Sequence, residues 1–259
     1  MIQQGYSKGF SYALIAAAGV LGVLIPPSIP FVTYGVATNA SIATMFMGGF
    51  MPGIILGLLL IITAVLSCKK HGFTGNGEQF SWAKVAANFK DAFWAILSPV
   101  IILGGIYGGI FTPTEAAVVS VVYALLVGLF IYKELNLKTL YAKFADAACT
   151  HGTVNIIVGT STILGRVLTL EQIPDMVATS MLSLTDNKIV MLMIINVLLL
   201  ACGCLLETNS SILILAPILY PVVANFGVDI VHFGLIMVVN LAIGFITPPV
   251  GVNLFVAIG

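Results

Sequence analysis

The chain of 259 residues carries ten basic and ten acidic side chains, so its formal net charge at pH 7 is zero. Hydrophobic residues make up 59% of it and charged residues only 8%, with a mean hydropathy of +1.12, whereas about 25% of a typical soluble domain is charged. This balance excludes a water-soluble globular protein. The pI near 6.8 excludes the basic surface that nucleic-acid binding requires, so the lipid bilayer is an expected partner and nucleic acid is not.

The first apolar run, Phe10–Ile25, ends at the proline pair Pro26-Pro27, and the next run is Thr44–Leu66. The second run is long enough to cross a membrane, because a spanning helix needs about 17–25 apolar residues. Lysines then gather in the stretch 68–92, and the positive-inside rule places this loop in the cytoplasm. The first run and its continuation are therefore expected to run outward, and Thr44–Leu66 inward.

Two further runs, Phe93–Ile110 and Ala116–Ile131, are expected to cross outward and back. The turn between them predicts a helix start, with Thr112 as the N-cap, Pro113 at the first helical position and Glu115 at the third. We therefore attribute Glu115 to capping rather than to transport.

The segment 134–147 has apolar residues at helical spacing and is expected to form an amphipathic helix on the inner face. Asn155–Leu168 is expected to cross outward. Ile173–Leu184 is too short and too polar to span, so we expect it at the outer surface.

A pair of apolar runs follows, Val190–Leu206 and Ser211–Val223, interrupted by the polar residues 207–210. The second run has about 13 residues, which is too short to span a bilayer. We interpret residues 190–224 as a re-entrant hairpin whose polar tip lies at mid-membrane, where irregular backbone persists only against protein or a water-filled cavity.

Two segments of the chain share a pattern of glycines and prolines displaced by 222 residues. Each double proline interrupts an apolar helix, and the topology above makes the two copies antiparallel, which is the signature of inverted-repeat secondary transporters. The matched positions are Gly5, Gly22, Pro26 and Pro27 in the first copy and Gly227, Gly244, Pro248 and Pro249 in the second.

The expected fold is therefore an all-α integral membrane protein, a multi-helix inverted-repeat transporter with one re-entrant hairpin and two Pro-Pro broken helices. Residues 1–67 are the C-terminal part of the first repeat, 68–92 a cytoplasmic loop, and 93–148 scaffold helices. Residues 149–259 form the second repeat, with a span, the hairpin 190–224 and the broken helix 230–257. The repeat also predicts a further hairpin before Gly5 and at least one more span after Pro249, so both ends are expected to be truncated.

The chemistry is expected where helices break, because unpaired carbonyls and positive helix N-termini meet there. Oxygen ligands with few fixed charges suit Na⁺ better than a transition metal. The expected Na⁺ ligands are Gly22, Pro26, Ser28, Thr208, Ser210, Gly244, Thr247, Val250 and Gly251. The expected solute-binding residues are Pro27, Asn209, Ser211, Pro248 and Pro249. The alternative is that these glycines and prolines only kink tightly packed helices.

For the other polar side chains, the sequence either leaves two roles open or favours a structural role. The sequence leaves two roles open for Glu207 at the hairpin tip: ion or proton coupling, or capping of the helix that follows. Arg166 either snorkels to the interface, which we favour, or attracts an anion. His232 and Asn240 are expected to make interhelical hydrogen bonds. The cysteines, in or beside apolar runs, are expected to be packing residues rather than disulfide or metal ligands; they are Cys68, Cys149, Cys202 and Cys204.

Three strings make the sequence recognisable. GVLGVLIPPSIPFVTYG (Gly19–Gly35), GGIYGGIFTPTEAAVVSVVYA (Gly104–Ala124) and HFGLIMVVNLAIGFITPPVGVNLFVA (His232–Ala257) resemble the large membrane (M) subunit of tripartite ATP-independent periplasmic (TRAP) transporters. The resemblance extends over the whole chain. The family's first hairpin has no counterpart here, and the tip Glu-Thr-Asn-Ser differs from the Asp-Thr or Asp-Pro of many members.

The resemblance implies a Na⁺-coupled symport permease of the elevator type, multi-pass in the bacterial inner membrane. It implies import of a C4-dicarboxylate, sialic acid or other sugar acid. It also implies a small membrane subunit (Q type) and a periplasmic solute-binding protein (P type) as partners.

Two alternatives remain. One is a carboxylate/Na⁺ symporter of a related inverted-repeat family that works without a binding protein. The other is a membrane-embedded enzyme, but the sequence has no HExxH and no paired intramembrane aspartates. We therefore expect no catalytic residues.

Overall fold

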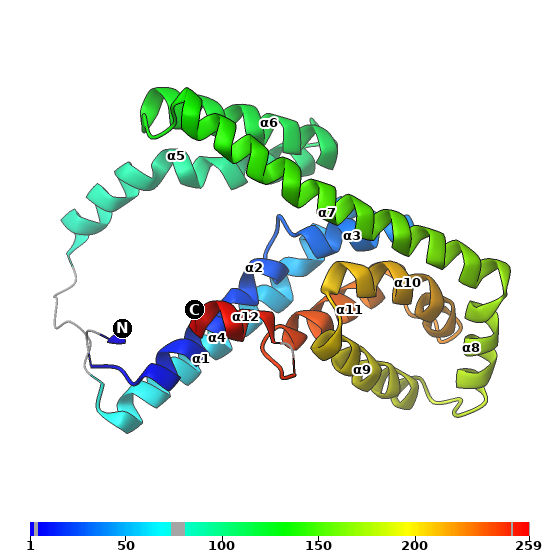
Figure 1. The fold of residues 1–259 in the computed structure, drawn as a ribbon. Helices are drawn as coiled ribbons and strands as arrows, with labels where there is room; N and C mark the ends of the chain where they lie inside the picture. Colours follow the sequence, from blue (N-terminus) through cyan, green and yellow to red (C-terminus); the bar gives the residue numbers. More distant parts are fainter. Residues whose placement is uncertain (3–4, 74–80, 250, 259) are drawn as a thin grey trace. The chain divides into compact units, whose positions relative to one another are not determined.

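The computed structural model describes residues 1–2, 5–73, 81–249 and 251–258, and within these ranges the regular structure is helical (Figure 1). The chain forms two compact units. One comprises Met1–Asn76 and Ile157–Gly259, and the other Gly77–Ile156. Helix α7 runs from the second unit into the first, and the two units are described separately below.

The first broken helix has the form that the proline pair predicts. Ser7 caps α1 (Lys8–Gly19), which continues through α2 (Leu21–Leu24). The proline pair follows, and α3 (Ile29–Thr38) leaves at 41° to the preceding axis. Proline lacks an N–H and its ring clashes with the carbonyl four residues back, so the α-helical bonding stops at this pair.

The long helix α4 (Ile42–His71) follows, with Ser41 as its N-cap. It ends where Gly72 adopts a left-handed conformation, φ 69°, and its last turn carries Lys69, Lys70 and His71. A glycine and basic residues at this end satisfy the last carbonyls and the helix dipole.

The second unit holds α5 (Trp82–Tyr107), α6 (Pro113–Leu126) and a π-helical turn, η2 (Val127–Ile131). The predicted capping box is confirmed: the Thr112 N–H donates to Glu115 Oε2 at 2.8 Å, and the Glu115 N–H donates to Thr112 Oγ1 at 3.3 Å. The predicted loop 68–92 is shorter than expected, because α4 extends to His71 and α5 begins at Trp82.

Helix α7 (Leu137–Leu170) is one continuous helix of 34 residues. The separate amphipathic helix 134–147 and the span Asn155–Leu168 were therefore wrong as distinct elements. The polar residues between them are helical, and the hydroxyls of Thr150 and Thr153 are satisfied within the helix, donating to the carbonyls of Asp146 and Cys149 one turn back.

The remaining helices of the first unit are α8 (Ile173–Leu182), α9 (Lys188–Leu205), α10 (Thr208–Ala224), α11 (Ile230–Gly244) and α12 (Val252–Ile258). The interruption between α9 and α10 is only two residues, not the predicted four. Thr208, Asn209 and Ser210 belong to the first turn of α10 because Glu207 acts as its N-cap.

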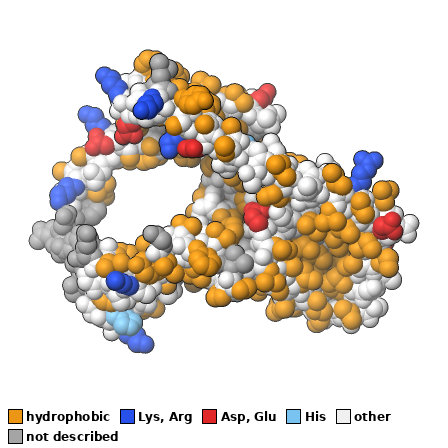
Figure 2. Space-filling model, in the orientation of Figure 1, with side chains coloured by type: hydrophobic (Ala, Val, Ile, Leu, Met, Phe, Trp, Pro, Cys, Tyr) orange, Lys and Arg blue, Asp and Glu red, His pale blue; other side chains and the backbone are white. Residues whose placement is uncertain are grey.

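Five described helices are long and apolar enough to cross a membrane, and the bent α1–α3 pair raises the number to six. The five are α4, α5, α6 with η2, α7 and α9. Hydrophobic side chains gather on the surface over α9 and α10 (Figure 2), and along α4 large side chains such as Ile54, Leu58 and Ile62 are exposed. An apolar exterior of this extent requires a lipid environment, so the protein is a multi-pass membrane protein.

The 222-residue displacement extends to features that glycine and proline spacing did not reveal. The N-caps Ser7 and Asp229 correspond, as do the helix starts Lys8 and Ile230. Gly5 and Gly227, with φ of 87° and 66°, lie two residues before these caps. The two copies therefore share their local backbone as well as their sequence pattern.

Candidate functional site

Two glycines fix where the hairpin tip meets the second broken helix. A side chain on Gly244 of α11 would lie 2.2 Å from the carbonyl of Gly203 of α9, so the two backbones are in direct contact. Both glycines lie at the C-terminal ends of their helices, directly before an interruption. The hairpin tip and the proline pair Pro248-Pro249 therefore each follow, along the chain, the point where α9 and α11 cross.

The first broken helix reaches the hairpin tip from another side. Thr33, one turn after the start of α3, donates its hydroxyl hydrogen to Asn209 Oδ1 at 2.9 Å. Helix α10 also packs along α3. The tip thus lies next to the second half of one broken helix and beside the end of the other.

Glu207 organises the tip from within. Its Oε2 accepts hydrogen bonds from the Ser210 N–H at 2.8 Å and the Ser210 hydroxyl at 3.1 Å, while Oε1 accepts from Asn209 Nδ2 at 2.8 Å. These are capping contacts, one of the two interpretations open from the sequence. Through Asn209 the capped turn is also connected to Thr33.

Thr208 presents a polar atom without a partner. The residue is 1% exposed, and its Oγ1 makes no hydrogen bond to any residue that the structure describes. Its neighbour Ser211 is fully buried but donates to the Glu207 carbonyl at 2.9 Å. Buried hydroxyls in proteins are normally hydrogen-bonded, and among the described residues the hydroxyls of Thr208 and Ser11 are buried without a partner.

Each proline pair leaves carbonyl groups without their helical hydrogen-bond donors, and other groups of the chain donate to some of these carbonyls. The hydroxyl of Ser28 donates to the Val23 carbonyl, which Pro27 leaves without its helical donor. The hydroxyl of Thr247 donates at 2.9 Å to the Ile243 carbonyl, which is not a freed group because it also accepts from the Ile246 N–H at 3.1 Å. The Asn253 N–H donates to the Phe245 carbonyl at 3.0 Å. Because each hydroxyl uses its hydrogen, its lone pairs remain free to accept a hydrogen bond or to bind a cation.

Most predicted site residues lie close to these interruptions, but Gly22 differs. It is exposed, and a side chain built on it would meet nothing within 4 Å. Val250 lies outside the described residues. The remaining predicted residues lie at or directly beside the three interruptions; they are Pro26, Pro27, Ser28, Thr208, Asn209, Ser210, Ser211, Gly244, Thr247, Pro248, Pro249 and Gly251.

Sequence reasoning missed Thr33, which binds the tip. Its only signal was a hydroxyl five residues after Ser28 in an otherwise apolar helix. It also missed Asn196, whose Oδ1 accepts from Asn240 Nδ2 at 2.6 Å across α9 and α11. That bond confirms the interhelical role expected for Asn240.

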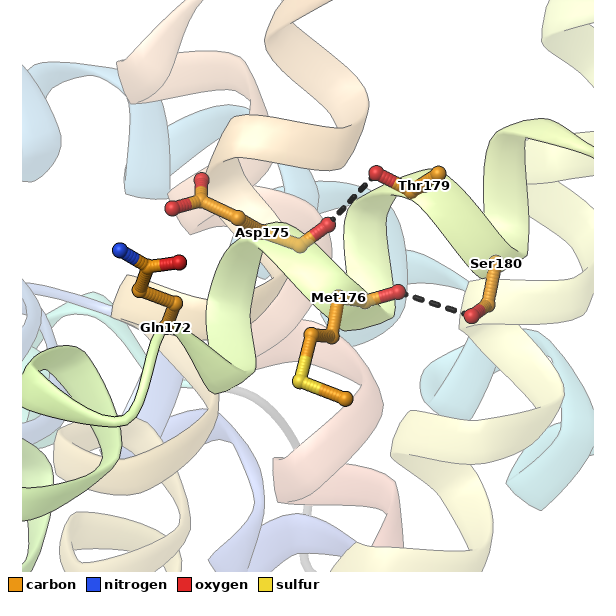
Figure 3. Close-up of a pocket in the computed structure, with 5 residues that line it drawn as sticks. All are labelled: Gln172, Asp175, Met176, Thr179 and Ser180. Atoms are coloured by element: carbon orange, nitrogen blue, oxygen red, sulfur yellow. Dashed lines mark hydrogen bonds between the residues drawn. The ribbon is translucent and has the colours of Figure 1, made fainter.

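In the described part of the chain no three His, Cys, Asp or Glu side chains come together. A recess on α8 lined by five residues from Gln172 to Ser180 also offers no site (Figure 3). Its hydroxyls are engaged locally, since Thr179 donates to the Asp175 carbonyl and Ser180 to the Met176 carbonyl, each at 2.8 Å.

The arrangement is that of a polytopic membrane protein whose polar site is built from interrupted helices. Its sequence matches, over residues 1–259, the family described as tripartite ATP-independent periplasmic transporter, DctM component. The chain therefore belongs to this family of transporters, and the resemblance seen in the three strings is confirmed.

Curated relatives agree with this assignment. The isethionate TRAP transporter permease protein DctMQ of Oleidesulfovibrio alaskensis is 50% identical over 100% of this chain and 41% of its own length. The C4-dicarboxylate and sialic acid TRAP transporter large permease proteins of Vibrio cholerae, DctM and SiaM, are 41% and 40% identical. Their alignments cover 100% and 97% of this chain but 61% and 58% of the relatives, so the chain spans about half the length of these proteins.

Proposed function

We propose that the chain acts in the permease subunit of a Na⁺-coupled secondary importer of a small organic anion in the bacterial inner membrane. A periplasmic binding protein delivers the solute, and a small membrane subunit completes the transporter. Family membership and the relatives named for isethionate, C4-dicarboxylate and sialic acid transport support the substrate class.

The observation that carries the ion site is the buried hydroxyl of Thr208. Thr208 is the first residue of α10, directly after the N-cap Glu207, and its Oγ1 has no hydrogen-bond partner among the described residues. A hydroxyl oxygen with free lone pairs, near carbonyls released by interrupted helices, is the type of ligand that a hard cation such as Na⁺ prefers.

The inverted repeat and the re-entrant hairpin belong to the same proposal. Contacts between the copies are reciprocal: α12 of the second copy packs on α1 of the first, and α3 of the first packs on α11 of the second. Reciprocal contacts are what a two-fold relation between copies produces. Helix α10 has 17 residues with two internal prolines, which favours a helix that turns back within the membrane.

The anionic group of the solute is expected at the hairpin tip. None of the predicted site residues is basic, so the charge must be balanced by helix N-termini, each equivalent to about half a positive charge, and by the bound Na⁺. Ion and solute then favour each other's binding, and the coupling is reciprocal. Raising Na⁺ should tighten solute binding by the factor by which saturating solute tightens Na⁺ binding.

The test is Na⁺-dependent uptake by the assembled transporter in proteoliposomes, with choline keeping the ionic strength constant. Thr208→Val removes the unpartnered oxygen and keeps the shape, so the apparent Na⁺ affinity should fall about tenfold or more. This corresponds to losing about 1.5 kcal/mol, the lower end of the range for hydrogen bonds to charged groups. Smaller losses are expected for Ser28→Ala, Thr247→Val and Ser210→Ala.

Thr179→Val on α8 is the matched control for Thr247→Val, because its hydroxyl also donates one turn back but lies outside the site. Unchanged Na⁺ dependence in Thr208→Val and in the three weaker variants would show that these residues only pack. Omitting the binding protein tests the tripartite mechanism: uptake that continues without it would favour the binding-protein-independent symporter.

A further inference from the structure

A groove of about 270 Å³ lies between α3, α10 and the part of α7 that belongs to the first unit. On α3 it is lined by Val36 and Ala37, and on α10 by Leu213 and Pro217. Ala37 and Leu213 each lie four residues beyond the two partners of the Thr33–Asn209 hydrogen bond. Four helical residues rise about 6 Å, so the groove opens one turn from the tip.

The α7 wall is made of small and hydroxyl-bearing residues, among them Ser161, Thr162, Gly165 and Thr169. Thr162 donates its hydroxyl hydrogen to the Val158 carbonyl at 2.8 Å, and Thr169 donates to the Gly165 carbonyl at 2.9 Å. Each hydroxyl has only one hydrogen to give. Toward the groove, therefore, these two side chains can only accept hydrogen bonds.

The α10 wall supplies acceptors of another kind. Pro217 and Pro221 lie inside the helix and have no N–H, so the carbonyls four residues earlier, those of Leu213 and Pro217, lose their usual helical donors. Both residues line the groove. None of its nine lining residues is charged, and Arg166, which follows Gly165, is not among them.

We infer that this groove receives the uncharged, hydrogen-donating end of the transported anion. Resting on the proposed function, this assigns the solute to a class: monoanions with a single carboxylate or sulfonate at the hairpin tip and a hydroxyl-bearing tail. A second ionised carboxylate is disfavoured because the lining holds no counter-charge for it, and because the Thr162 and Thr169 hydroxyls can only accept hydrogen bonds.

Two matched series of anions test the inference by direct binding to the assembled membrane complex in nanodiscs, measured by calorimetry in saturating Na⁺. One is ethanesulfonate, 2-hydroxyethanesulfonate and sulfoacetate; the other is propionate, 3-hydroxypropionate and malonate. Within each series the tail changes from methyl to hydroxymethyl to carboxylate. In at least one series the hydroxyl compound should bind about tenfold more tightly than the methyl compound, and the dianion more weakly than both.

Thr162→Val and Thr169→Val remove the acceptors without changing side-chain shape. Each should reduce the preference for the hydroxyl compound over the methyl compound severalfold. Thr179→Val on α8 carries the same kind of local hydrogen bond outside the groove, and should keep the full preference.

Three results would overturn the inference: equal binding of hydroxyl and methyl compounds in both series, tighter binding of a dianion, or an undiminished preference in both groove variants. None of these contradicts Na⁺-coupled anion transport. Failure of every compound to bind in a Na⁺-dependent way would instead overturn the proposed function, and the groove assignment with it.

Discussion

The segments 5–35 and 227–257 share N-caps and proline breaks at one displacement, but they differ in what covers them. On α11, Met237 is fully buried and Asn240 is 7% exposed, because α9 packs along this face. The corresponding residues of the first copy are Ile15, which is 53% exposed, and Ala18, also exposed. One helical pattern therefore gives a buried face in one copy and an open face in the other, and the neighbour decides which.

Gly22 and Gly244 occupy equivalent positions in the two copies, and their surroundings differ. Gly244 touches the backbone of Gly203, whereas nothing lies within 4 Å of a side chain placed on Gly22. The close approach of two helix backbones requires small residues, as in membrane helix pairs generally.

The largest expected effect is that of Gly244→Leu. Four new carbon atoms would have to enter a backbone-to-backbone contact, so α9 and α11 must separate and the hairpin tip must move. We expect a loss of about 3 kcal/mol or more and no transport. Thermal unfolding of the purified permease measures the loss of stability. Gly104→Leu in α5 is the control, because that glycine has open space around it. Equal melting temperatures for both variants would contradict the packing described.

The second prediction concerns Gly22→Leu. The repeat predicts a further hairpin before Gly5, and its first helix should cover the Gly22 face as α9 covers Gly244. In the complete permease, Gly22→Leu should therefore lower the melting temperature to an extent comparable with Gly244→Leu. A melting temperature equal to that of the Gly104→Leu control would show that the first copy's face meets only lipid.

A smaller effect is expected from the hydrogen bond between Asn196 and Asn240. Asn196→Leu leaves the buried Asn240 amide without this partner, which should cost about 1–3 kcal/mol of stability. The double variant Asn196→Leu/Asn240→Leu removes both polar groups and should recover part of the loss. Denaturation of the four proteins in a double-mutant cycle measures the coupling, and strictly additive losses would show that the bond contributes nothing.

The confirmed sequence predictions concern local chemistry. The capping box at Thr112 follows from short-range rules, because its two reciprocal hydrogen bonds lie within one helical turn. The predictions that were wrong concern lengths. Helix α7 continues through a Thr-rich stretch that hydropathy divides in two, and the threonine hydroxyls bond to their own helix.

The sequence alone determined the membrane environment and the helical class, because composition and periodicity act locally, and its three strings carried the resemblance to the family. Only the tertiary structure decided which break residues meet. It placed Gly203 against Gly244, joined Thr33 to Asn209 across 176 residues of sequence, and left the Thr208 hydroxyl without a partner. Such contacts depend on how helices distant in sequence pack against one another, and no local pattern of residues specifies that packing.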